Sequence, residues 1–133
     1  MRKLVLGVGC KRHVSIEELE KALDEFLHRH GVERQELFML ASCDVKNNEP
    51  GLLKLACRLG VNIKFFPPTA LCQVPIPNPS ARVREKIGSP SVAEAASLLA
   101  GKGQLIVPKQ KFITITFALA TCKLENQESN LNG

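Results

Sequence analysis

Short apolar runs alternate with helical patterns along the first half of this chain, and that alternation limits the folds it can adopt. Residues 3–8, 36–43 and 61–66 have the length and composition of buried strands. The segments between them carry apolar residues at helical spacing, begin at Ser15 and near Pro50, and end at Gly31 and Gly60. We therefore expect three parallel strands joined by right-handed crossovers, with helices on both faces of the sheet.

The second half of the chain predicts further helices and a closing hairpin. Five prolines fall within residues 67–80, which we expect to be irregular apart from one helical turn near residues 69–72. A short helix over residues 81–87 precedes another that ends near Ala100. That second helix begins either after Ser89, with Pro90 at its first position, or after Ser91, which pairs with Glu94 as a capping box. Residues 105–107 and 112–119 are expected to pair as antiparallel strands, with a tight connection at residues 108–111.

These elements together predict an α/β fold. We expect a single three-layer α/β/α domain over residues 1–122, with a mixed, mostly parallel sheet of about five strands that ends in an antiparallel hairpin. Residues 123–133 are polar and are expected to form a flexible tail.

The net charge of +5 is spread unevenly over the 133 residues. Eight basic and eight acidic side chains balance in residues 1–46, whereas residues 47–133 hold ten basic and five acidic ones. The surplus is either a solvated basic surface or a site for an anion. Trp and Tyr are absent, and basic and aromatic residues are not interleaved as in RNA-binding strands. We therefore expect a compact polyanionic small molecule rather than nucleic acid as the partner.

Other classes of protein do not fit the sequence. No apolar run approaches the roughly 18 residues of a membrane helix, and the first residues do not form a secretory signal, so we expect a cytoplasmic protein without membrane contact. The five cysteines are odd in number and include no CxxC pair, which fits thiols in a reducing compartment. No Cys and His spacing indicates a metal site. Arg12 replaces the third glycine of the dinucleotide-binding pattern, and we predict no cofactor.

The candidate site lies where strands of an open α/β sheet end, because ligands bind beyond those carboxyl ends. Gly7, Gly9, Cys10, Lys11 and Arg12 follow the first strand and combine exposed amides with two cations before a helix. The alternative is a simple strand-to-helix turn. Cys10 is a possible nucleophile, although cysteines are more often small buried hydrophobes.

Two further loops supply candidates. Asp44 and Lys46 follow the second strand, where Asp44 could act as a general base or orient a nearby cation. Glu49 or Asn48 in the same loop is interpreted as the cap of the helix that begins near Pro50. Lys109 and Lys111 flank the predicted hairpin connection, where they either contact an anion or protect the sheet edge from aggregation.

Five motifs occur in order along the chain and resemble one known family. They are Gly7-Val8-Gly9-Cys10-Lys11-Arg12, residues 41–46 with Glu49-Pro50-Gly51-Leu52, residues 74–80, residues 88–96, and Val107-Pro108-Lys109-Gln110-Lys111. Together they resemble the C-terminal domain of cobalt-precorrin-5A hydrolase, called CbiG, and its free-standing relative CobE. The resemblance covers about residues 3–119.

The resemblance implies a role in cobalamin biosynthesis on a precorrin or cobalt-precorrin intermediate. CbiG-type proteins open the ring-A lactone of cobalt-precorrin-5A and release acetaldehyde, so Asp44 becomes the candidate for proton chemistry. Alternatives are a non-catalytic corrinoid carrier of the CobE type and a nucleotide- or nucleic-acid-binding domain. Contact with other enzymes of the corrin pathway is a further expectation. The residues expected to bind the intermediate are Gly7, Gly9, Cys10, Lys11, Arg12, Lys46, Ser89, Ser91, Lys109 and Lys111.

Overall fold

A computed structural model describes residues 3–10, 13–44, 49–74 and 92–123. Its strands are β1 (Leu4–Cys10), β2 (Leu37–Cys43), β3 (Asn62–Phe66), β4 (Lys102–Lys111) and β5 (Ile115–Cys122). The helices are α1 (Ile16–His30), a 3-10 turn η1 (Arg34–Glu36), α2 (Pro50–Leu59), α3 (Pro68–Cys72) and α5 (Val92–Gly101). The predicted helix over residues 81–87 lies outside the described residues.

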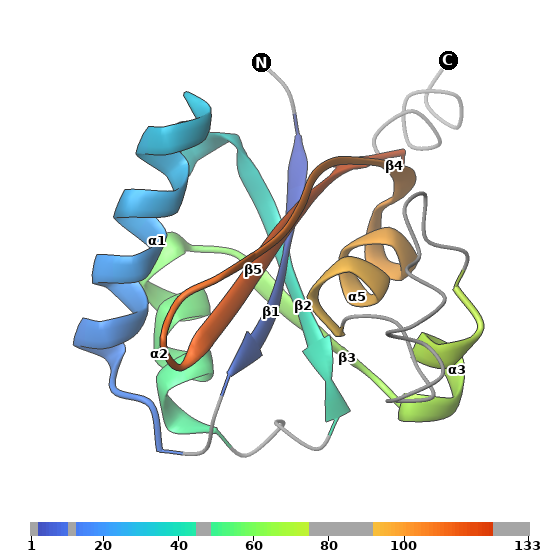
Figure 1. The fold of residues 1–133 in the computed structure, drawn as a ribbon, viewed down its shortest axis with the longest axis horizontal. Coiled ribbons are helices and arrows are strands. Elements are labelled where there is room, and N and C mark those ends of the chain that lie inside the picture. Colours follow the sequence, from blue (N-terminus) through green and yellow to red (C-terminus); the bar gives the residue numbers. More distant parts are fainter. Residues whose placement is uncertain (1–2, 11–12, 45–48, 75–91, 124–133) are drawn as a thin grey trace.

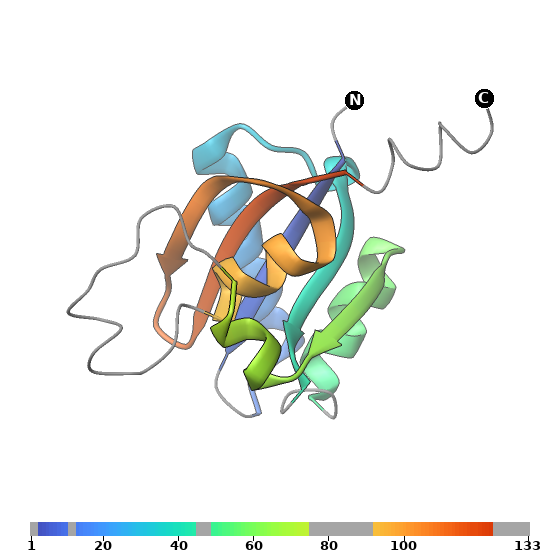
Figure 2. The same cartoon turned by 90° about the vertical axis from the view of Figure 1, so that its right-hand side faces the viewer.

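The strands form one mixed sheet in the order β3-β2-β1-β5-β4. The β1–β2 and β2–β3 pairs are parallel, whereas β5 runs antiparallel to both β1 and β4. Helices α1 and α2 cover one face, and α3 and α5 cover the other (Figure 1). Figure 2 shows α3 and α5 in front of the sheet and α1 behind it. The predicted α/β class, the mixed sheet and the closing hairpin are confirmed.

Helix α1 begins and ends as its sequence predicts. The Ser15 hydroxyl accepts from the Glu18 amide at 3.0 Å, and the Glu18 carboxylate accepts from the Ser15 amide at 3.3 Å, which completes a capping box. Gly31 ends the helix with φ of 63°, in the left-handed region that favours glycine. Six apolar residues then bury one face of the helix against the sheet: Ile16, Leu19, Ala22, Leu23, Phe26 and Leu27.

Strand boundaries at the carboxyl end of the sheet differ from the prediction. Gly9 and Cys10 belong to β1 rather than to a loop, because they pair with Thr116 and Ile115 of β5. The predicted connection at residues 108–111 is instead the end of β4, and the turn falls at residues 112–114. Pro108 is tolerated there because β4 is an edge strand and its register is irregular between Val107 and Gln110.

Strand β1 and helix α5 meet at Gly7 more closely than a side chain would allow. A Cβ built on Gly7 would lie 1.8 Å from the Ala93 carbonyl oxygen. Helix α5 therefore rests directly on the backbone of the central strand, and its neighbouring residues Ala93, Ala96 and Ser97 are fully buried. Gly7 is required by this contact.

We expect Gly7→Ala to lower the free energy of unfolding by about 3 kcal/mol, because the added methyl forces α5 away from β1. Gly9→Ala is the matched control, since its Cβ would meet nothing closer than 3.9 Å and should change stability by less than about 1 kcal/mol. Urea unfolding measures both variants. Equal stability of the two would contradict the close contact.

Candidate functional site

One row of residues crosses three strands at the carboxyl edge of the sheet. Gly9 of β1 pairs with Thr116 of β5, and Thr116 pairs with Lys111 of β4. Directly paired residues project to the same face of a sheet. The Cβ of Thr116 and the Cβ of Val92, the first residue of α5, each lie 3.9 Å from the point that a Gly9 Cβ would occupy. The row therefore lies on the α5 face, beside the start of that helix.

The preceding residue confirms the orientation of Lys111. Gln110 projects to the opposite face, where its side-chain oxygen lies 2.8 Å from Nε2 of His30 on α1. Because successive side chains of a strand alternate, Lys111 faces α5. Lys109 and Lys111 are both exposed. This end of β4 thus presents two cations beside a glycine and a hydroxyl group.

Glu94 fixes that end of β4 to α5. Its carboxylate oxygen Oε2 accepts a hydrogen bond from the Lys109 backbone amide at 3.0 Å, although only 7% of Glu94 is exposed. The contact falls in the irregular segment between Val107 and Gln110. Glu94 also lies in the first turn of α5, where the helix dipole stabilises a negative charge. A buried carboxylate therefore holds the backbone of a residue predicted to bind the ligand.

Sequence reasoning considered Glu94 only as the partner of Ser91 in a capping box. Its contact with Lys109 joins residues 15 positions apart and has no local sequence pattern. The sequence feature that could have indicated this role is that Glu94 is the single charged residue of its helix. Its neighbours there are small and buried: Ala93, Ala95, Ala96 and Ser97.

A second buried carboxylate holds the loop after β1. Glu49 is the N-cap residue of α2, as predicted, but its side chain does not cap that helix. Instead Oε2 accepts from the His13 backbone amide at 2.8 Å. His13 has φ of 62°, a conformation that favours glycine. The Glu49 hydrogen bond therefore ties a strained loop residue to the start of α2.

The other predicted site residues separate into three groups. Asp44 directly follows β2 and is half-buried at the same edge of the sheet. Cys10 packs against the cluster on the α1 and α2 face, which fits a small hydrophobe, and Gly7 is covered by α5. The remaining predicted residues lie outside the described ones: Lys11, Arg12, Lys46, Ser89 and Ser91.

A hollow of about 400 Å³ between η1 and the end of α2 is less suited to an anion. It is lined by Glu33, Arg34, Gln35, Arg58 and Leu59. Arg34 lies 2.8 Å from Asp24, and Arg58 lies 2.6 Å from Glu20. The hydrogen bond that Arg34 donates to the Asp24 carboxylate raises the pKa of Arg34. Both arginines already have carboxylate partners, so their charges are largely neutralised.

Two kinds of site are not found among the residues that the structure describes. No three His, Cys, Asp or Glu side chains converge there as metal ligands. Within the same residues, each helix falls short of the length or the hydropathy that crossing a bilayer requires.

The contact between Glu94 and Lys109 predicts a graded response to substitution. We expect Glu94→Ala to lower the free energy of unfolding by about 2 kcal/mol, because it leaves the Lys109 amide without its acceptor. Glu94→Gln keeps an acceptor oxygen and should lose less than half as much. Urea unfolding gives the stabilities, and amide hydrogen exchange at Lys109 reports the bond itself. An unchanged rate of amide exchange at Lys109 in Glu94→Ala would rule out this hydrogen bond.

Comparisons with known proteins agree with this architecture. A family model described as cobalamin synthesis G C-terminus matches residues 4–120. The chain is 29% identical over 118 residues to cobalt-precorrin-5A hydrolase of Priestia megaterium, a match that covers 88% of this chain and 32% of the hydrolase. The chain thus spans about a third of the length of that enzyme.

A shorter relative is matched over most of its length. The chain is 32% identical over 121 residues to protein CobE of a Sinorhizobium species, covering 88% of this chain and 79% of CobE. The crystal structure of a CobE from the cobalamin biosynthetic pathway superposes with a TM-score of 0.77 at 36% identity, covering 90% of this chain and 93% of that one. The family model and the CobE match show that the chain belongs to the cobalamin synthesis G C-terminal family, which includes CobE.

Proposed function

We propose that the chain binds a carboxylate-rich intermediate of cobalamin biosynthesis at the carboxyl edge of its sheet. The observation that carries this proposal is the row formed by Gly9, Thr116 and Lys111 beside the first residue of α5. Intermediates of this pathway have a large macrocycle with many carboxylate side chains. A basic rim over small residues suits such a ligand, because the rim pairs with carboxylates while the small residues let the ring approach.

Lysine side chains supply the charge in this proposal. Lys109 and Lys111 extend from the end of β4, and an ammonium group bonds a carboxylate more strongly than neutral groups bond one another. The Thr116 hydroxyl adds a hydrogen-bond donor between Lys111 and Gly9. Lys11, Arg12 and Lys46 belong to the predicted loops after β1 and β2 and extend the same proposal. Ser89 and Ser91 precede α5 in the sequence and remain predicted contacts.

A binding role, as a carrier of the intermediate, is favoured over hydrolysis by what the relatives share. This chain matches most of CobE but about a third of the hydrolase from Priestia megaterium. Recognition of a pathway intermediate is the property that a domain common to both proteins can supply. None of the five cysteines is placed in a disulfide, and a reducing, cytoplasmic setting is part of this proposal.

The first test measures binding. We expect cobalt-precorrin-5A to change its visible spectrum on titration with the protein, and Lys111→Gln to weaken this binding about tenfold through loss of a charge-assisted hydrogen bond. Lys54→Gln, on α2 at the other face of the sheet, is the matched control and should bind as the unaltered protein does. Raising the salt concentration should weaken binding less in Lys111→Gln. Equal affinities of the two variants would contradict the proposed rim, and absence of any spectral change would contradict the function.

The second test separates binding from catalysis. We expect the protein to bind cobalt-precorrin-5A without releasing acetaldehyde, as measured by a coupled dehydrogenase assay and by the mass of the recovered intermediate. Acetaldehyde release would replace the carrier role with lactone hydrolysis. In that event Asp44→Asn should abolish release while retaining the spectral change, because the amide cannot accept the proton that a general base removes.

A further inference from the structure

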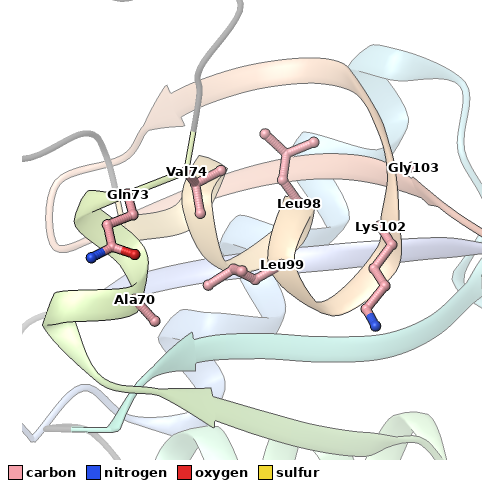
Figure 3. Close-up of a pocket in the computed structure, with 7 residues that line it drawn as sticks. All are labelled: Ala70, Gln73, Val74, Leu98, Leu99, Lys102 and Gly103. Atoms are coloured by element: carbon pink, nitrogen blue, oxygen red, sulfur yellow. The ribbon is translucent and has the colours of Figure 1, made fainter.

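A pocket of about 490 Å³ lies beside the second half of α5, away from the row at Gly9. It opens between α3, α5 and the start of β4, as Figure 3 shows. Its lining residues are Ala70, Gln73, Val74, Leu98, Leu99, Lys102 and Gly103. A volume of this size accommodates a small organic molecule.

The pocket is apolar in its middle and polar at its two ends. Leu99 extends from α5 toward Ala70 of α3, with Gln73 at one end of the pocket and Lys102 at the other (Figure 3). Leu99 and Val74 are half-buried and pack on the apolar cluster beneath. Among the described lining residues none is acidic, so the Lys102 ammonium gives this pocket a positive end.

Lys102 occupies a backbone position that disfavours a side chain. It is the residue after α5, and its φ is 59°, in the left-handed region that residues other than glycine rarely adopt. Glycines stand on both sides of it, at positions 101 and 103. Helices commonly end with one residue in this conformation, which is most often a glycine. Here it places a cation at the end of an apolar pocket.

We propose that this pocket binds a small apolar carboxylic acid, with its hydrocarbon body against Ala70, Val74 and Leu99 and its carboxylate on Lys102. The charge of the pocket matches an anion, and the apolar middle excludes a ligand that is polar throughout. The pocket shares none of its residues with the row at Gly9, so this proposal does not rest on the proposed function.

Lys102 also lies at the C-terminus of α5, where the helix dipole favours a cation without any ligand. The experiment therefore varies the charge of the ligand as well as that of the protein. Octanoate and 1-octanol serve as a matched pair of probes, with the same hydrocarbon chain and different head groups. Two-dimensional amide NMR of the full chain follows each titration, and we expect shifts at Ala70, Leu99 and Gly103.

Three variants make the test decisive. Lys102→Gln should weaken octanoate binding about tenfold and leave 1-octanol unchanged, because only the carboxylate loses its partner. Lys54→Gln, an exposed lysine on α2, should bind octanoate as the unaltered protein does. Lys102→Gly relieves the left-handed strain, so it should raise the melting temperature and still weaken octanoate binding.

The results that would overturn the proposal are equally definite. If Lys102→Gln or Lys102→Gly binds octanoate as tightly as the unaltered protein, Lys102 does not bind the carboxylate. Equal affinity for octanoate and 1-octanol would show that charge is not recognised, and absence of shifts at the pocket amides would place any binding elsewhere. No corrinoid is present in this experiment, so its outcome is separate from that of the proposed function.

Discussion

The rest of the structure depends on the contact between the Gly7 backbone and the first turn of α5. The Ala93 carbonyl oxygen occupies the space that a side chain at Gly7 would take, so the helix lies directly on the central strand. This approach brings Val92 beside Gly9 and Thr116. It also brings Glu94 within hydrogen-bond distance of the Lys109 amide. The position of the candidate site thus follows from the absence of a side chain at one residue of β1.

The two faces of the sheet are packed by different means. On the α1 and α2 face the core contains large residues such as Leu23, Phe26 and Phe117, each of which stabilises the fold by roughly 1.5–3 kcal/mol on burial. The α5 face instead buries many small residues, among them Ala95, Ala96 and Ala100 of that helix. Small residues let the α5 backbone approach the sheet closely. The large apolar residues on the α1 and α2 face therefore supply most of the stability. The small residues between α5 and the sheet position the residues with candidate functions.

Patterns local to the chain predicted the elements, and contacts between distant residues accounted for what was missed. The capping box of Ser15 and Glu18 predicts the start of α1, and Gly31 predicts its end. Both signals are visible in the sequence because each acts within one helix. The end of β4 was wrongly assigned to a turn, because Pro108 and the lysines around Gln110 are typical of turns and of edge strands alike. The hydrogen bonds from His13 to Glu49 and from Lys109 to Glu94 span 36 and 15 positions, and no short-range pattern indicates them.

Those two glutamates perform the same task at two helices. Glu49 and Glu94 lie at the starts of α2 and α5. Each accepts a hydrogen bond from a backbone amide of a different segment. The start of a helix is a favourable position for a carboxylate, because the helix dipole places partial positive charge there. Both glutamates thus direct their charge inward, to amides and helix termini, while Lys109 and Lys111 extend outward. The exposed lysines and the buried glutamates can therefore occupy the same part of the fold. The lysines face solvent, whereas the glutamates face backbone amides and helix termini.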